Sequence, residues 1–166
     1  DTDIIWLRNP FNQLSKNETM DMQISVDMHN TDLINTGFYY VKSNNKTISL
    51  FKKWYQRKEN STGMKEQDVL AGLLNEGIFT KLGLTFKLLD TLHFSGFCQD
   101  STDIQKVITV HANCCRHIGA KFHDLARVLH EWKQFKASPS TNVNFHWSPH
   151  TQCWNSWNDT KYRPIS

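Results

Sequence analysis

The two acids at the head of the chain are the first residues whose type and spacing suggest chemistry. Asp1 and Asp3 stand two residues apart and precede the apolar, β-branched run Ile4-Ile5-Trp6-Leu7. In an extended chain, residues i and i+2 point to the same side, so both carboxylates can face one divalent cation at a strand end. Such a cation can hold a diphosphate and carry its charge as it leaves. The pattern is short and common, and the alternative is two solvated acids before a strand.

Three further stretches place polar groups beside glycine or at the ends of expected elements. Asn35-Thr36-Gly37 opens a strand, where glycine lets a substrate approach the backbone and where an ordinary entry turn is the alternative. Glu66-Gln67-Asp68 lies on the first turn of a helix, where acids also compensate the helix dipole. His111 follows an apolar strand, either as a metal ligand or as a half-buried imidazole.

A zinc site is the rival use of the residues around His111. Its ligands would be His111, Cys114, Cys115, His117 and His123. Their spacing matches no usual Cys-x-x-Cys pair, and adjacent cysteines chelate poorly. The sequence also has no nucleophile elbow and no glycine-rich phosphate loop. We therefore favour the site at Asp1 and Asp3.

Composition limits the classes of protein that this chain can represent. Its 166 residues, 39% of them hydrophobic, suit one domain with a core. The net charge is +3 and the basic residues are scattered, so no nucleic-acid partner is predicted. No apolar run approaches the ~18 residues of a membrane span, and no signal-peptide pattern is present.

Two features favour a lumenal or secreted protein. Four Asn-x-Ser/Thr acceptor sequences occur in polar surroundings, beginning at Asn17, Asn45, Asn60 and Asn158. Four cysteines fit an oxidising compartment: Cys98, Cys114, Cys115 and Cys153. Three full pairings are possible, and because adjacent cysteines rarely bond each other, Cys114 and Cys115 each need a distant partner.

The hydrophobic pattern predicts the elements that must position these residues. Strands are expected over residues 4–7, 20–28, 37–42, 85–89 and 107–110. The second of these alternates apolar and polar side chains, which indicates a strand buried on one face only. The segment 94–98 is expected to be a loop. Strands and helices mix along the chain, so the fold class is α/β.

Helices are predicted over three segments: from Ser43 or Asn44 to 58, from 65 to 75, and from 120 to 136. The first has an apolar stripe made of Ile48, Phe51, Trp54 and Tyr55. The second turns Val69, Leu70, Leu73 and Leu74 inward and stops at Gly77. The third buries Leu125, Val128, Leu129, Trp132 and Phe135. The segment after Ser138-Pro139 has no period and is read as an irregular tail, pinned through Cys153.

Four stretches, in this order, carry a resemblance to a known family: 1–11, 35–44, 66–70 and 111–115. Together they resemble the plant nucleotide-diphospho-sugar transferase domain of glycosyltransferase family 77, whose members include arabinosyl- and xylosyltransferases of cell-wall polymers and glycoproteins. The resemblance covers residues 1 to about 136 and includes the segment 94–98 and the last helix. The tail matches mainly through Cys153.

The resemblance implies a GT-A fold, in which a nucleotide-binding half precedes the Asp-x-Asp motif. That half is absent here, so we expect a partial GT-A-type fold: residues 1–137 are the C-terminal part of the domain and residues 138–166 are the tail. A free α-amino group at Asp1 would oppose cation binding. The isolated chain is therefore expected to be an inactive fragment of an enzyme whose membrane anchor lies upstream.

The resemblance also implies roles for individual residues. Asp1, Asp3 and His111 would coordinate Mn²⁺ or Mg²⁺ with the diphosphate of a UDP-sugar donor. The residues expected to bind substrate are Asn35, Thr36, Gly37, Gln67 and Gly96. Asp68, with Glu66 beside it, would be catalytic, as nucleophile or as stabiliser of an oxocarbenium-like centre in a retaining reaction.

The expected function is transfer of a sugar, a pentose by resemblance, to a cell-wall glycan or glycoprotein acceptor in the Golgi lumen. The alternative is a non-catalytic lumenal domain, structural or carbohydrate-binding, that uses the tryptophans of the tail. Donor sugar, acceptor and disulfide pairing stay open at this point.

Overall fold

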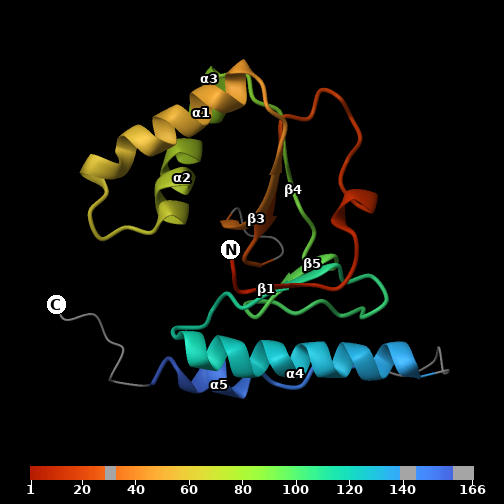
Figure 1. Cartoon of the computed structure of the whole chain (residues 1–166). Coiled ribbons are helices and arrows are strands. Elements are labelled where there is room, and N and C mark those ends of the chain that lie inside the picture. Colours follow the sequence, from red (N-terminus) through yellow and green to blue (C-terminus); the bar gives the residue numbers. More distant parts are fainter. Residues whose placement is uncertain (29–32, 139–144, 159–166) are drawn as a thin grey trace. The chain divides into compact units, whose positions relative to one another are not determined.

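The computed structural model divides the chain into two compact units (Figure 1). It describes residues 1–28, 33–138 and 145–158. One unit comprises residues 1–12 and 90–166, and the other comprises residues 13–89. Both contain strands and helices, so the predicted α/β class is confirmed. Within the described ranges, no helix combines the length and apolar character needed to cross a bilayer.

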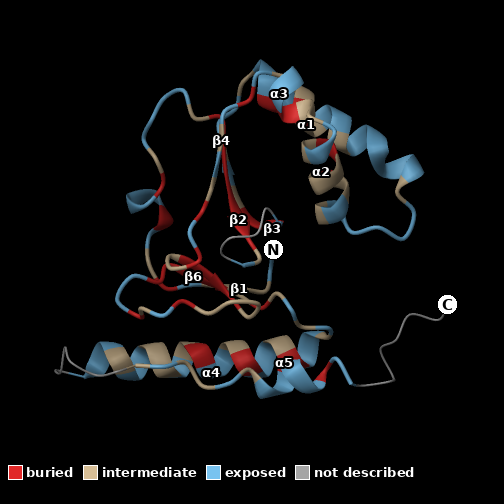
Figure 2. Ribbon diagram, turned by 180° about the vertical axis from the view of Figure 1, so that it is seen from behind, coloured by how far each residue is buried: buried red, intermediate tan, exposed pale blue. Residues whose placement is uncertain are grey.

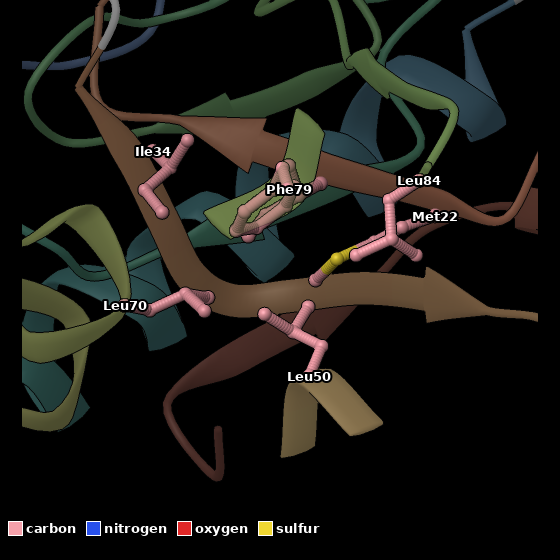
Figure 3. Close-up of a cluster of buried hydrophobic side chains, with 7 residues drawn as sticks. Met22, Ile34, Leu50, Leu70, Phe79 and Leu84 are labelled. Carbon is pink, nitrogen blue, oxygen red and sulfur yellow. The ribbon is translucent and has the colours of Figure 1, made fainter. Parts of the chain in front are cut away.

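The unit of residues 13–89 contains a three-stranded sheet in the order β3-β2-β4. Strand β2 (Met22–Val26) pairs antiparallel with β3 (Ile34–Val41) and parallel with β4 (Phe86–Leu88). The helices are α1 (Asn45–Gln56), α2 (Glu66–Asn75) and the short α3 (Ile78–Lys81), with a 3-10 turn η2 (Arg57–Asn60) after α1. A buried cluster joins sheet and helices (Figure 3); it consists of Met22, Ile24, Ile34, Leu50, Leu70, Phe79 and Leu84.

Strand β2 is buried on both faces, so the prediction of a half-buried strand was wrong. All five of its residues are buried, because Met22 and Ile24 pack in the hydrophobic cluster while Gln23 and Ser25 bond to other segments of the chain. The polar side chains are hydrogen-bonded internally: Gln23 accepts from the Ser15 amide at 2.8 Å and donates to the Ser15 carbonyl at 3.2 Å. Ser25 donates to the Phe38 carbonyl at 2.9 Å. The alternating polar residues of this strand are therefore buried and hydrogen-bonded to other parts of the chain, and they do not face solvent.

Strand β3 begins three residues earlier than predicted, so Asn35 and Thr36, which were expected in an entry turn, belong to the strand together with Gly37. Its pairing with β2 is irregular: Ile24 is opposite Tyr39, whereas the next residue, Ser25, is opposite Asn35. The three residues 36–38 are therefore inserted in β3 relative to β2, an irregularity larger than the single extra residue of a common β-bulge. An irregularity of this kind re-aims side chains at a sheet edge.

Helix α1 confirms the predicted start but corrects the predicted stripe. The Asn44 side chain accepts from the amides of Lys46 and Thr47 and so caps the helix. Leu50 is buried, whereas Ile48 is 45% and Tyr55 67% exposed. The buried face is thus centred about one position away from the predicted one. Helix α2 ends as predicted before Gly77, which adopts a positive φ of 73°.

The unit of residues 1–12 and 90–166 contains a second sheet in the order β1-β6-β5. Strand β1 (Ile4–Trp6) pairs antiparallel with β6 (Thr109–His111), and β5 (Phe94–Gly96) pairs parallel with β6. The segment 94–98, predicted as a loop, therefore begins with a strand. A 3-10 turn η1 (Pro10–Asn12) follows β1.

Helix α4 (Ile118–Ala137) supplies the other side of this unit's core (Figure 2). The buried cluster consists of Leu7, Ile104, Val107, Val110 and Val128. Leu129, Trp132 and Phe135 pack against it, which confirms most of the stripe predicted for this helix. The unit therefore has a core of its own, built from residues far apart in the sequence.

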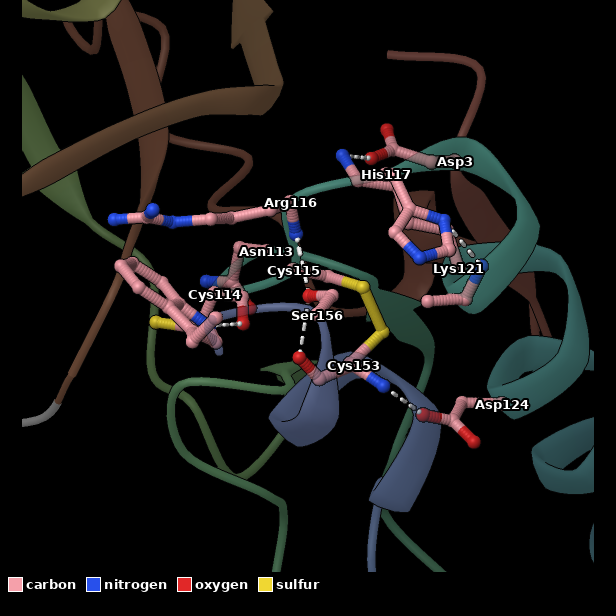
Figure 4. Close-up of a disulfide and its surroundings, with 12 residues drawn as sticks. Asp3, Asn113, Cys114, Cys115, Arg116, His117, Lys121, Asp124, Cys153 and Ser156 are labelled. Atoms are coloured by element: carbon pink, nitrogen blue, oxygen red, sulfur yellow. Dashed lines mark hydrogen bonds and ion pairs between the residues drawn. A yellow bond between two sulfur atoms is a disulfide. The ribbon is translucent and has the colours of Figure 1, made fainter. Parts of the chain in front are cut away.

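Two disulfides cross-link the same unit, Cys98–Cys114 and Cys115–Cys153. The adjacent cysteines thus take different distant partners, as expected. The second bond holds a short helix, α5 (Thr151–Asn155), beside α4, within the segment predicted to be an irregular tail (Figure 4). The amide of Cys153 donates to the buried Asp124 carboxylate at 2.8 Å. Pinning of the tail through Cys153 is confirmed.

Candidate functional site

Asp1, Asp3 and His111 converge at one end of the β1-β6 pair. One ligand atom from each lies within 4.8 Å of the other two. The His111 Nε2 atom is 3.3 Å from Asp3 Oδ1 and 3.6 Å from Asp1 Oδ2. In the part of the chain that the structure describes, this is the one cluster of three or more carboxylate, imidazole or thiol ligands.

The register of the two strands produces this convergence. Ile4 is opposite His111, so the last residue of β6 lies next to the start of β1, where Asp3 immediately precedes the strand. The Ala112 amide donates to the Asp3 carbonyl at 3.0 Å and extends the pairing by one step. The sequence shows that Asp1 and Asp3 share a side, but the pairing with β6 is a long-range feature.

The three ligands differ in burial. The side chains of Asp3 and His111 are only 11% and 12% exposed, whereas that of Asp1 is 48% exposed. Asp3 and His111 are thus surrounded by other protein groups, whereas Asp1 faces solvent. An arrangement of this kind leaves coordination positions for a ligand from solution.

Lys121 is a site residue that the sequence analysis missed. It lies in the first turns of α4, and its ammonium group donates to Asp3 Oδ2 at 2.6 Å (Figure 4). Burial alone raises the pKa of the Asp3 carboxyl, but the Lys121 hydrogen bond and the charges of His111 and Lys121 outweigh it, so the pKa is lowered. Asp3 is therefore ionised at neutral pH, as a metal ligand must be. Nothing local in the sequence marks this lysine.

The zinc alternative is wrong. Cys114 and Cys115 are both oxidised in disulfides, so neither can supply a thiolate. His117 instead caps α4, where its Nδ1 accepts from the Ala120 amide at 3.1 Å.

Asn35, Thr36 and Gln67 meet in the other unit, in a polar network between β3 and the start of α2. The Thr36 amide donates to Gln67 Oε1, and the Thr36 hydroxyl donates to Glu66 Oε1, both at 3.1 Å. The Gly37 amide donates to Asn35 Oδ1 at 2.7 Å. The network therefore joins four of the predicted substrate-binding residues with Glu66.

Asp27, at the end of β2, is the second residue that the sequence analysis missed. Its two carboxylate oxygens accept from Asn35 Nδ2 at 2.7 Å and from Gln67 Nε2 at 3.2 Å. The Asp27 carboxylate thus holds the NH₂ groups of two side-chain amides. The amide oxygens, Asn35 Oδ1 and Gln67 Oε1, are then free to accept from the backbone amides of Gly37 and Thr36.

Asp68 lies outside these hydrogen bonds. It is exposed, and its Oδ2 accepts from the Lys65 amide at 3.3 Å, which satisfies a free donor at the start of α2. Gly96 lies in the unit that contains the metal ligands and is opposite His111 in the sheet. A Cβ atom at Gly96 would come within 2.5 Å of the Asn113 side chain, whose Oδ1 accepts from the Cys98 amide. This position therefore requires glycine for packing.

The predicted site residues thus form two groups. Asp1, Asp3, His111 and Gly96 belong to one compact unit, whereas Asn35, Thr36, Gly37, Glu66, Gln67 and Asp68 belong to the other. Asp1, Asp3 and His111 of the first group form a candidate divalent-cation site, built from two carboxylates and one imidazole at a strand end.

Comparison with known proteins gives the family. Residues 1–125 match the model of the nucleotide-diphospho-sugar transferase family, and the chain belongs to that family. It is 61% identical to the uncharacterized protein At1g28695 of Arabidopsis thaliana over 99% of this chain and 49% of that protein. It is 35% identical to the uncharacterized protein At4g15970 of the same plant over 89% of this chain and 42% of that protein. The chain thus spans about half the length of these relatives. No solved structure matches it significantly.

Proposed function

We propose that this chain carries the metal and diphosphate site of a glycosyltransferase that uses a UDP-sugar donor with Mn²⁺ or Mg²⁺. The observation that supports this most directly is the convergence of Asp1, Asp3 and His111 within 4.8 Å. Family membership alone implies a nucleotide-sugar donor, and the cluster supplies oxygen and imidazole ligands suited to these ions. A bound ion would neutralise charge on the leaving diphosphate.

The residues around this cluster have complementary roles in the proposal. Asp3, with its lowered pKa, stays ionised, and burial of Asp3 and His111 fixes their positions before a ligand arrives. Lys121 offers a second positive charge beside Asp3, where it can pair with a diphosphate oxygen. Together these groups hold and compensate a dianionic leaving group.

For the sugar, we propose that Asn35, Thr36, Gly37 and Gln67 bind the donor and that Asp68 provides the carboxylate at the reacting carbon. The network anchored on Asp27 supports the role of Asn35 and Gln67, because it fixes the orientation of both side chains. The role of Asp68, which lies outside that network, is proposed from the resemblance alone. Retention of configuration, a pentose donor and a glycan or glycoprotein acceptor follow from the resemblance to glycosyltransferase family 77. A Golgi location is supported by two disulfides, which persist in oxidising compartments.

Titration calorimetry with Mn²⁺, with and without UDP, tests the metal site directly. We expect Asp3→Asn to weaken Mn²⁺ binding by at least about tenfold, the scale on which even outer-shell partners of a metal act. Asp100→Asn is the matched control, because Asp100 also faces an imidazole in the same unit, at 2.9 Å from His150. Equal Mn²⁺ affinity in the wild type and Asp3→Asn would contradict the proposal.

Thermal unfolding separates this function from that of a carbohydrate-binding domain. A ligand that binds only the folded state raises the melting temperature. UDP should therefore stabilise the chain only when Mn²⁺ is present, and not in Asp3→Asn. Stabilisation by free glycans without any effect of UDP and Mn²⁺ would favour the carbohydrate-binding alternative.

A further inference from the structure

Two tryptophans at the C-terminal end of the described chain are exposed around one cavity. Trp154 is 76% and Trp157 45% exposed, and both line a cavity of about 790 Å³. The ring of His150 lines it too and stacks on Phe97, with centroids 3.6 Å apart. The Arg116 guanidinium lies over the Trp157 ring, 4.1 Å from its centroid, and Trp157 Nε1 donates to the Cys114 carbonyl at 2.7 Å. Trp154 is the more open ring, and an aromatic ring left open beside a cavity indicates a site that another group covers.

Hydrogen-bonding groups lie among these rings. The Asp100 carboxylate lines the cavity, is 37% exposed and accepts from His150 Nε2 at 2.9 Å. The Asn155 amide lines the same cavity. Flat apolar rings beside polar groups suit a sugar, which has an apolar ring face and a rim of hydroxyl groups.

A glycan attached to Asn158 is the sugar best placed to reach this surface. It lines the cavity and is the first residue of the acceptor sequence Asn158-Asp159-Thr160. The helical turn continues past α5, because the Trp157 amide donates to the Trp154 carbonyl at 3.2 Å and the Asn158 amide donates to the Asn155 carbonyl at 3.0 Å. Both bonds reach the third residue back, as in a 3-10 turn, so the chain stays tightly wound after α5. Asn158 therefore remains at the cavity that Trp154 and Trp157 also line.

The acceptor sequence at Asn45 folds differently. Thr47 is 2% exposed, and its hydroxyl donates to the Lys42 carbonyl and accepts from the Asn44 amide in the cap of α1. Its hydroxyl is therefore part of the fold. Asn17 and Asn60 are exposed and provide internal markers of whether the chain has met the glycosylation machinery.

We propose that Asn158 carries an N-linked glycan whose first sugars cover Trp154 and Trp157. Attachment forms a bond from Asn158 Nδ2 to C1 of the first sugar and breaks the bond from C1 to a lipid-linked diphosphate. The lipid diphosphate leaves with the electron pair, and the amide loses one proton. The proposal requires passage through the lumen, as the Proposed function does, but it does not depend on transferase chemistry.

The experiment expresses the chain with an added signal peptide in a eukaryotic cell, beside the variants Asn158→Gln and Thr160→Ala. Peptide mass spectrometry after enzymatic glycan removal gives the occupancy of each acceptor asparagine. Hydroxyl-radical labelling of the intact proteins then measures the accessibility of individual tryptophans. Trp6, which is 56% exposed and is not a cavity residue, is the internal standard.

We expect occupancy at Asn158 in the wild type and its loss in both variants. Labelling of Trp154 and Trp157 should be several-fold lower in the glycosylated wild type than in either variant, with Trp6 unchanged. An unmodified Asn158 overturns the proposal, and glycans at Asn17 or Asn60 then show that the chain had reached the lumen. Equal labelling of Trp154 with and without the glycan also overturns it. Protection of the unglycosylated variants by a free oligosaccharide to the same degree assigns the cavity to an external glycan instead.

Discussion

At the scale of single residues, the contact between Lys121 and Asp3 decides how the metal site behaves before a ligand binds. The ammonium group lies 2.6 Å from Asp3 Oδ2, an atom that a cation would also use. Lys121 therefore stabilises the ionised carboxylate and at the same time competes with a metal for it. A diphosphate would relieve this competition, because it offers Lys121 another anionic partner.

This competition predicts opposite effects of one substitution. In Lys121→Met, we expect tighter binding of Mn²⁺ alone, because a cation is removed from the site, but weaker binding of UDP in saturating Mn²⁺. Calorimetry measures both affinities, and Lys121→Arg, which keeps the charge, is the matched control. If both affinities changed in the same direction, Lys121 would not be shared between Asp3 and the diphosphate.

At the scale of elements, Asp21 connects three parts of the unit of residues 13–89. It is buried at the start of β2 and accepts from the Thr85 amide at 2.9 Å, from Lys46 Nζ at 3.0 Å and from Asn44 Nδ2 at 2.8 Å. These donors belong to the approach to β4, the first turn of α1 and its cap. Burial alone raises the pKa of Asp21. The hydrogen bonds from Thr85, Lys46 and Asn44 lower the pKa by more than burial raises it, so the net shift is downward.

The lowered pKa of Asp21 predicts how stability depends on pH. The unfolded chain binds the proton more readily than the folded one, so the contribution of Asp21 is complete above the ordinary pKa of 3.8 and is lost as the pH falls through the lower folded value. Asp21→Asn should lower the free energy of unfolding at pH 7 by about 2 kcal/mol, the cost of breaking charge-assisted hydrogen bonds. Urea unfolding at pH 7 and near pH 3 measures this.

The difference between wild type and Asp21→Asn should shrink at the lower pH. Lys46→Met is the control: its ammonium is half-exposed, so its loss should cost less than that of Asp21. A difference that is constant with pH would contradict the assigned ionisation of Asp21.

What the sequence could predict at this scale depended on how local each signal was. The cap at Asn44, the stop at Gly77 and the apolar face of α4 were predicted because each signal lies within a few residues. Three other features could not be predicted: the burial of both faces of β2, the irregular pairing of β3, and the contact of Lys121 with Asp3. Each depends on partners that are distant in the sequence, 8 to 118 residues away. The metal ligands fall between these cases: their chemical types were evident, but their convergence depended on a strand pairing.

At the scale of the whole molecule, the cross-links are distributed unevenly. Both disulfides join residues of the unit that contains the metal ligands, and all four cysteines are used. The unit of residues 13–89 has no cysteine, so its buried cluster and hydrogen bonds hold it together without a disulfide. The two units therefore differ in their sensitivity to the redox state of their surroundings.

Reduction should therefore act first on the unit that contains α4 and α5. The disulfides close sequence separations of 16 and 38 residues, and loops of these sizes contribute roughly 3 to 4 kcal/mol each. Hydrogen exchange with and without dithiothreitol should show lost protection in β6, α4 and α5, with α1 and α2 protected as before. The paired variant Cys115→Ser and Cys153→Ser should reproduce the loss around α5 without reductant. Equal loss of protection in α1 and α2 would show instead that the described chain unfolds as one cooperative body.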